Sequence, residues 1–395
     1  MPSSLSARLT ALQQQTGNAV PQRKALSEPS DRSRTLSRLS KRRQRKQTAL
    51  LGQLQAYLGV PAVDQGFIEL RFKAPMDQAG LDSTVPATLS GPPWSGSTPT
   101  QRLVFIDTET TGLSGGAGTK VFQVGICWFD GQDIAVYQSL LTDPGAEREF
   151  LEAFIAEVPS DAILVSYNGK SFDLPLLATR LRMNRLRDSL VGLPHVDLLY
   201  SIRRAYRKSW PQCTLKAAES RLLGVKRVDD LPGAMAPEAW KAFVLGRAFK
   251  PVADVLSHNK QDILSLAGLA IVITDIFRNP ESYDADLCGV ANAWRDHDLT
   301  TAESILRRCG DDDIAARLQL AEHIRQQYGY DEAVELWQVL AAKHRCTVSL
   351  RRLAIYYEHY KKDPAVAHHY ASQLVMLECK QEHEHRLSRL VANLR

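Results

Sequence analysis

The sequence predicts an α/β fold in which helices flank a mixed β-sheet, followed by a separate all-α domain. Two observations lead to this prediction. Between residues 100 and 280, short apolar runs that are typical of buried strands alternate with stretches of helical periodicity. From residue 285 to residue 395 the apolar pattern is helical throughout and repeats itself. A chain of 395 residues is long enough for two or three such domains.

Residues 1–99 are expected to form a basic, partly disordered N-terminal arm and linker. Residues 1–50 contain 11 Lys or Arg and 2 Asp or Glu, a balance of +9, so the rest of the chain carries −4 of the net charge of +5. The basic residues are densest in "RSRTLSRLSKRRQRK", residues 32–46. Such a run suits contact with nucleic-acid phosphates, and a solvated arm explains it equally well.

Three elements are expected within this N-terminal region. Residues 35–58 have the pattern of a basic, then amphipathic, helix. "GFIELRF", residues 66–72, reads as a lone strand. Residues 74–100 are rich in Pro, Gly, Ser and Thr and are typical of a linker or long loop.

The central region predicts a ribonuclease-H-like sheet from the order of its elements. Strands are expected at residues 102–107, 121–129, 134–141 and 162–169, and helices at residues 145–158 and 171–186. Asp130 and Gly131 favour a hairpin between the second and third strands. Residues 193–199 predict a short strand or the start of a helix. Three antiparallel strands, a helix, and then a further strand and helix is the order of that fold.

The C-terminal region predicts paired helices. Residues 318–337 and 352–371 align with an offset of 34 residues that places Ala333 over Ala367. This spacing resembles tetratricopeptide (TPR) hairpins, in which small residues let helices pack closely. Residues 291–306 would be a shorter capping unit. A plain helical bundle is the alternative.

The composition is that of an ordinary globular protein, with 44% hydrophobic and 24% charged residues. No apolar stretch approaches the roughly 18 residues of a membrane helix, and no secretory signal is evident. The six cysteines are scattered and form no CxxC pair, which favours reduced thiols and a cytoplasmic location.

Acidic residues lie at the boundaries of two predicted elements, at the end of a strand and at the start of a helix. Asp107 and Glu109 lie two apart at the end of a buried strand, so their side chains point to the same face. Taken alone, such a pair is more often a solvated strand end than a metal site. Asp173 lies in the first turn of a helix, next to Phe172, where the helix dipole also favours an acid.

A third element completes the pattern. His258 and Asp262 are four residues apart on a long predicted helix and therefore share one face. A lone pair of this kind is usually a surface pair. Its combination with the strand and helix acids matters more, because two-metal phosphoryl chemistry needs carboxylates that hold ions about 3.5–4 Å apart.

The three motifs DxET, NxxxFD and HxxxD resemble those of the DEDD superfamily of 3′–5′ exonucleases. The flanking residues are similar to the YprB-like ribonuclease-H-like exonucleases over about residues 100–275. The stretches that carry the resemblance are "FIDTETTGLSGGAGTKVFQVG", "SYNGKSFDLPLL", "HVDLLYSIRR", "CTLKAAESRLLGVKRVDDLPGAMAP" and "VLSHNKQDILSLA". The helical C-terminal region also resembles that family.

The resemblance implies a role for each site residue. Two Mg²⁺ or Mn²⁺ ions would be held by Asp107, Glu109, Asp173 and Asp262, and His258 would be the general base. Candidate substrate-binding residues are Thr110, Thr111, Gly112, Leu113, Asn168 and Phe172. Leu113 would act as an apolar wedge, and Phe172 would stack on a base or anchor its helix. Asp197 is a nearby acid with either an assisting or a structural role.

The spacing between His258 and Asp262 differs from that of the histidine subclass of the superfamily. The histidine subclass has four residues between His and Asp, and the tyrosine subclass has three between Tyr and Asp. This chain has His258 at the tyrosine spacing, so the subclass stays open.

The resemblance implies a metal-dependent 3′–5′ exonuclease that releases nucleoside 5′-monophosphates, acting on DNA rather than RNA, in DNA repair. The TPR-like region would then dock a DEAD/DEAH-type helicase or another repair protein. Three alternatives remain: a non-catalytic TPR scaffold with a nucleic-acid-binding domain, a structure-specific endonuclease, and an RNA-processing exonuclease. A P-loop protein is excluded because no GxxxxGK[ST] motif is present.

Overall fold

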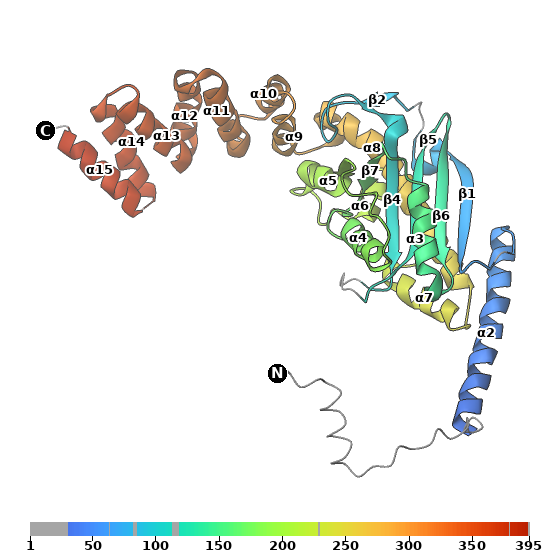
Figure 1. Cartoon of the computed structure of the whole chain (residues 1–395). Coiled ribbons are helices and arrows are strands. Elements are labelled where there is room, and N and C mark those ends of the chain that lie inside the picture. Colours follow the sequence, from blue (N-terminus) through green and yellow to red (C-terminus); the bar gives the residue numbers. More distant parts are fainter. Residues whose placement is uncertain are drawn as a thin grey trace, which may run out of the picture.

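A six-stranded mixed sheet forms the centre of the computed structural model, which describes residues 31–62, 64–81, 85–112, 118–227, 230–378 and 380–393 (Figure 1). Its strands lie in the order β1-β6-β5-β4-β7-β8. They are β1 (Phe67–Pro75), β4 (Leu103–Thr110), β5 (Val121–Asp130), β6 (Asp133–Leu141), β7 (Ile163–Ser166) and β8 (His195–Asp197). The pairs from β1 through β4 are antiparallel, whereas β4–β7 and β7–β8 are parallel.

The predicted ribonuclease-H-like order is confirmed. β5 and β6 form a hairpin closed by the pair Asp130↔Asp133, and Gly131 in the turn has a left-handed φ of 65° that glycine adopts without strain. The stretch at residues 193–199 contains both predicted elements, because β8 leads directly into helix α5 (Leu198–Tyr206).

Helices cover both faces of the sheet. Val104 and Ile106 of β4 pack into a core shared with α3 (Glu147–Ala156), α4 (Asp173–Met183) and α7 (Ala236–Val244). Leu103 and Phe105 face a second core shared with α5 and the long helix α8 (Lys250–Arg278). Shorter helical segments, α6 (Leu215–Ala218) and η4 (Glu219–Leu223), lie between α5 and α7 in the chain. The alternation along β4 thus places odd-numbered side chains on the α8 face.

The expected linker before residue 100 is wrong. β1 is an edge strand that pairs with β6 from Phe67↔Leu141 to Pro75↔Asp133, so it is not a lone strand. After it come η1 (Met76–Ala79) and a small sheet of β2 (Thr88–Leu89) with β3 (Thr98–Pro99). Trp94 is fully buried, and its Nε1 donates a 2.7 Å hydrogen bond to Thr274 Oγ1 of α8. The described residues between 67 and 99 are therefore part of the folded domain: β1 covers the edge of β6, and Trp94 is buried against α8.

The helix predicted at residues 35–58 is present as α2 (Asp31–Leu58). Its C-terminal half packs on the sheet domain through the buried side chains of Leu51 and Leu54. The disorder expected for residues 1–30 concerns residues outside the described part of the chain.

The C-terminal region is all-α, as predicted, and extends away from the sheet (Figure 1). Its helices are α9 (Leu287–Trp294), α10 (Leu299–Arg308), α11 (Ile314–Tyr328), α12 (Tyr330–His344), α13 (Thr347–His359), α14 (Pro364–Leu377) and α15 (Gln381–Asn393). Each packs against the next. The aligned residues Ala333 and Ala367 are both fully buried, at the small-residue positions of two successive helix pairs. Membership of the TPR class stays a prediction.

Two further expectations can be compared with the structure. Cys127, Cys213, Cys288, Cys309 and Cys346 are free thiols, and Cys379 lies outside the described residues. Within the described ranges, no helix combines the length and the apolar character needed to cross a membrane.

Candidate active site

Acidic side chains gather at the end of β4, where the first turn of α4 and the middle of α8 meet it. Asp107 and Glu109 share a face of β4, opposite Gly125 and Gln123 of β5. A pocket of about 590 Å³ is lined by Asp107, Glu109 and Asp173. It is also lined by four of the predicted substrate-binding residues, Thr110, Gly112, Asn168 and Phe172. The structure thus brings together residues from two of the three predicted motifs in one pocket.

Burial raises the pKa of all four carboxyl groups that were predicted to be metal ligands. For Asp107 the pKa lies well above its usual range, first through desolvation and then through the charges of Asp262, Asp173 and Glu109. Desolvation, followed by repulsion from Asp262 and Asp173, raises the pKa of Glu109 to about 8. Desolvation also raises the pKa of Asp173 and that of Asp262. Asp262 therefore belongs to the same electrostatic cluster, which a bound cation would stabilise in its ionised form.

The raised pKa of Glu109 predicts a pH-dependent stability. A carboxyl group whose pKa rises on folding favours the folded state most below its unfolded pKa, and this contribution is lost as the pH rises through about 8. In EDTA, Glu109→Gln should therefore gain stability over the wild type, by about 1–3 kcal/mol, on going from about pH 5 to about pH 8. Unfolding in urea at the two pH values measures this.

The control for that experiment is Glu152→Gln, because Glu152 lies on α3 with its side chain 59% exposed. Its difference from the wild type should not change with pH. An equal change for both variants would contradict the pKa shift of Glu109.

Two buried amides that sequence reasoning missed hold Asp107. Asn259 Nδ2 donates to Asp107 Oδ2 at 2.8 Å, and Gln138 Nε2 donates to Asn259 Oδ1 at 2.8 Å. A Cβ atom on Gly125 would lie 2.1 Å from Asn259 Oδ1, so only glycine leaves room for this amide. The available signal was the position of Asn259 beside His258 on a helix with an apolar buried face.

His258 and Asp262 share a face of α8, as the four-residue spacing predicts. His258 Nε2 lies 3.5 Å from Asp262 Oδ2. On its other side, His258 Nδ1 lies 2.6 Å from Asp230 Oδ1. Arg227 Nη1, which can only donate, lies 3.2 Å from the same Nδ1, so His258 is flanked on this side by a carboxylate and a cation. Asp230 lies in the "VDDLP" stretch, and the sequence motifs did not predict a role for it.

Arg227 was also missed, although it contacts three acids: Asp262 on α8, Glu219 on η4 and Asp230. Its guanidinium forms an ion pair with Asp262 Oδ1 and donates from Nε to Glu219 Oε2 at 2.8 Å. The side chains of Arg227 and Glu219 are only 6% and 1% exposed. Oδ1 of Asp262 is thus bound by Arg227, whereas Oδ2 faces His258.

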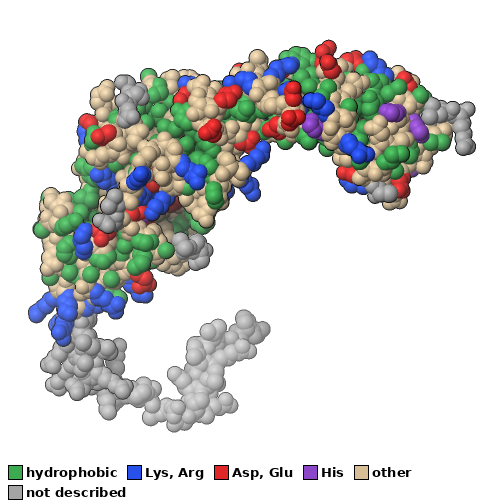
Figure 2. Space-filling view, turned by 180° about the vertical axis from the view of Figure 1, so that it is seen from behind, with side chains coloured by type: hydrophobic (Ala, Val, Ile, Leu, Met, Phe, Trp, Pro, Cys, Tyr) green, Lys and Arg blue, Asp and Glu red, His purple; other side chains and the backbone are tan. Residues whose placement is uncertain are grey.

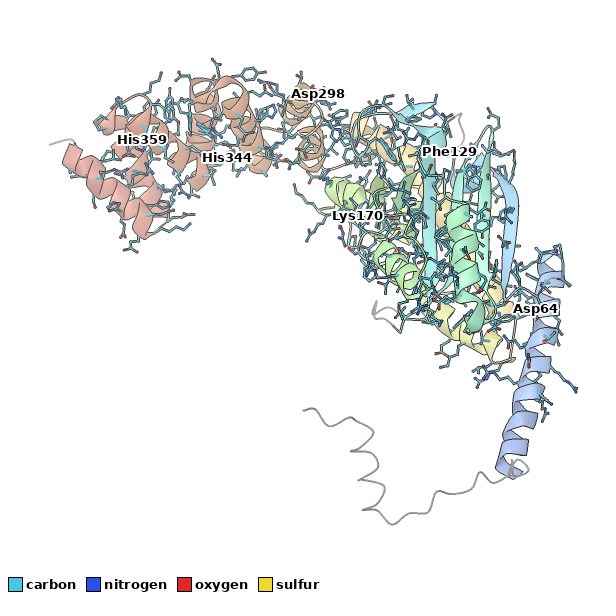
Figure 3. The ribbon with its side chains drawn as sticks, viewed as in Figure 1. Asp64, Phe129, Lys170, Asp298, His344 and His359 are labelled. Atoms are coloured by element: carbon cyan, nitrogen blue, oxygen red, sulfur yellow. The ribbon has the colours of Figure 1, made fainter. Side chains whose placement is uncertain are left out.

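The turn between β7 and α4 is shaped by Asp197. Its carboxylate accepts from the backbone N–H of Asn168 at 2.7 Å and of Lys170 at 3.1 Å, and it also caps α5. Asn168 is thereby held at a left-handed φ of 68°. These contacts favour the structural role for Asp197. Lys170, labelled in Figure 3, has its Nζ over the ring of Tyr200 on α5. Phe172 is 53% exposed where it lines the pocket.

The threonines after Glu109 close the base of the glycine-rich loop. Thr110 Oγ1 donates to the carbonyl of Gly112 at 2.9 Å, and Thr111 Oγ1 accepts from the N–H of Lys120 at 2.9 Å. Leu113, the predicted wedge, and the rest of the loop through residue 117 lie outside the described residues. The approach of this backbone to a nucleotide therefore stays a prediction.

The carboxylate cluster suits a hard divalent ion by its donor set, because Mg²⁺ and Mn²⁺ prefer oxygen ligands. Gln123, opposite Glu109, has both amide atoms buried with no hydrogen-bond partner among the described residues. Among the residues that the structure describes, no group of three or more His, Cys, Asp or Glu side chains is arranged as a metal site. Asp107 and Asp173 instead bind Asn259 and Thr108. The metal-ligand roles stay predictions.

Comparisons with known proteins agree with the fold. A family model described as the RNase_H superfamily matches residues 104–274, the region that contains β4 through most of α8. The chain is also 34% identical over 276 residues to an uncharacterized protein, YprB, from Bacillus subtilis (strain 168). The matched region is 66% of each chain, just under two thirds of the relative's length.

Proposed function

We propose that this chain, which belongs to the YprB-like family of the ribonuclease H superfamily, is a metal-dependent 3′–5′ exonuclease. The observation that supports this most is the carboxylate cluster at the end of β4, in which the charges of Asp262 and Asp173 raise the pKa of both Asp107 and Glu109. Such a cluster destabilises the fold unless cations bind it, and it adjoins a pocket large enough for a nucleotide.

In the proposed reaction, the four acids of the cluster (Asp107, Glu109, Asp173 and Asp262) would hold two Mg²⁺ or Mn²⁺ ions. When bound, such ions lower the pKa of water and neutralise the charge that develops on the phosphodiester. His258, whose Nε2 lies 3.5 Å from Asp262 Oδ2, would accept the proton of the attacking water. The exposed ring of Phe172 offers a stacking surface for a base next to the cleaved bond. The product is a nucleoside 5′-monophosphate.

DNA in a repair pathway is the proposed substrate, on the strength of the family resemblance. The helical C-terminal region would then serve to dock a helicase of the DEAD/DEAH type or another repair protein.

The proposal is tested with the purified full chain, Mg²⁺ or Mn²⁺, and 5′-labelled DNA and RNA in single- and double-stranded form. We expect a ladder of products shortened from the 3′ end and nucleoside 5′-monophosphates in the mass spectrum. A circular single strand should be resistant. Cleavage of the circle would instead identify an endonuclease, binding without cleavage would identify a scaffold, and a strong preference for RNA would favour RNA processing.

A further inference from the structure

Five basic side chains project from the part of α2 that leaves the sheet domain. They are Lys41, Arg42, Arg43, Arg45 and Lys46, and all five are exposed. None of the five forms an ion pair with an acid among the described residues. Figure 2 shows this group of Lys and Arg side chains at the end of the molecule from which α2 projects. We call these five residues the basic segment.

The basic segment is held in place by the domain. Gln47 Nε2 donates to the carbonyl of Thr142 at 2.9 Å, and Arg43 Nη2 donates to the carbonyl of Val244 at 3.4 Å. Gly246, with a left-handed φ of 71°, lies so close to α2 that an added Cβ would be 3.1 Å from Lys46 Cβ. The cations therefore have a defined position relative to α7.

Helix α7 connects the basic segment to the candidate active site. Pro237, at the N-terminal end of α7, lines the site pocket, and Val244, at its C-terminal end, contacts α2. The nine residues of α7 span about 13 Å. At about 3.4 Å per nucleotide of a stacked strand, this length corresponds to roughly four nucleotides.

We propose that the basic segment of α2 binds the phosphate backbone of the nucleic-acid substrate, starting about four nucleotides from the end in the active site. This inference rests on the proposed function, which identifies the substrate as a nucleic acid. Five exposed cations that have no acidic partner among the described residues attract a polyanion without reading its sequence, and their binding releases counterions. Residues 51–395 carry a net charge of −4, so the positive charge is confined to the N-terminal region that contains this segment.

The experiment measures binding of the full chain to labelled single strands of about 4 and about 20 nucleotides by fluorescence anisotropy, in EDTA, over a series of salt concentrations. The test variant changes all five residues of the basic segment to Gln, which keeps helix propensity. We expect roughly tenfold or greater loss of affinity for the long strand at low salt and a salt slope reduced by about 3. Affinity for the short strand should stay unchanged.

Two control variants are used. The first keeps the charge of the segment and changes its side chains, and the second removes the same number of cations from another region. Arg42→Lys, Arg43→Lys and Arg45→Lys together should keep the wild-type salt slope. A matched variant of the C-terminal helices changes five exposed cations to Gln: Lys343, Arg345, Arg351, Lys361 and Lys362. It should bind the long strand as the wild type does.

The inference is overturned if the basic-segment variant binds the long strand like the wild type, or if the short and long strands lose affinity equally. Binding to anionic lipid vesicles that depends on the segment, with unchanged binding to the long strand, would assign it to a membrane surface and also overturn the inference. Nuclease assays on the same proteins keep the two proposals distinguishable. A chain that binds through this segment but cleaves nothing would refute the exonuclease and leave the inference standing.

Discussion

Asp107→Asn is expected to lower the rate of metal-dependent nucleic-acid hydrolysis by about 10²–10³-fold or more. Burial and the neighbouring charges raise the pKa of Asp107 well above its usual range, and its carboxylate accepts a hydrogen bond from the buried amide of Asn259. An amide at this position keeps the shape of the side chain and can still accept from Asn259. It cannot supply the negative charge that a divalent ion needs.

The same substitution should not weaken the fold. Removing one of several repelling charges should keep or raise the midpoint of thermal unfolding in EDTA near neutral pH. Activity is measured as initial rates on a 5′-labelled oligonucleotide, with Glu152→Gln as a control that keeps wild-type activity. Wild-type activity in Asp107→Asn would contradict the proposed role of the cluster.

Arg227→Met is expected to lower the free energy of unfolding by about 3–5 kcal/mol, because it leaves two buried carboxylates without their cation. Glu219 and Asp262 both contact this guanidinium, and Glu219 is almost completely inaccessible. The measurement is urea unfolding at neutral pH in EDTA.

A matched control and a double variant sharpen this test. Arg307→Met removes the pair between the exposed Arg307 and Glu303 on α10 and should cost no more than about 1 kcal/mol. Arg227→Met combined with Glu219→Gln should recover part of the lost stability, since one of the unpaired charges is gone. If Arg227→Met is no more destabilising than Arg307→Met, the buried ion pairs do not hold this part of the site together.

Local patterns predicted much of the sheet domain correctly. The apolar run before Asp107 indicated β4, the Asp-Gly dipeptide indicated the β5–β6 hairpin, and the spacing of His258 and Asp262 placed both on one face of α8. These predictions succeed because strand alternation, turn chemistry and helix periodicity are properties of neighbouring residues.

The residues that were missed depend on contacts between distant segments. Arg227 reaches Asp262 across 35 residues, and Asn259 reaches Asp107 across 152. The position of Asn259 on a helix with an apolar face indicates burial but not its partner, and Arg227 has no signature within its own segment. The pairing of β1 with β6 was missed for a similar reason, since an edge strand is recognised only from the sheet that it joins.

Anomalous diffraction from crystals soaked in Mn²⁺ tests the central claim most directly, which is that four carboxylates hold two divalent ions. We expect two peaks about 3.5–4 Å apart, with carboxylate oxygens of Asp107, Glu109, Asp173 and Asp262 as ligands. Asp107→Asn crystals should lose at least one peak. The absence of both peaks from the wild-type cluster at saturating Mn²⁺, or peaks bound only by other residues, would contradict the account.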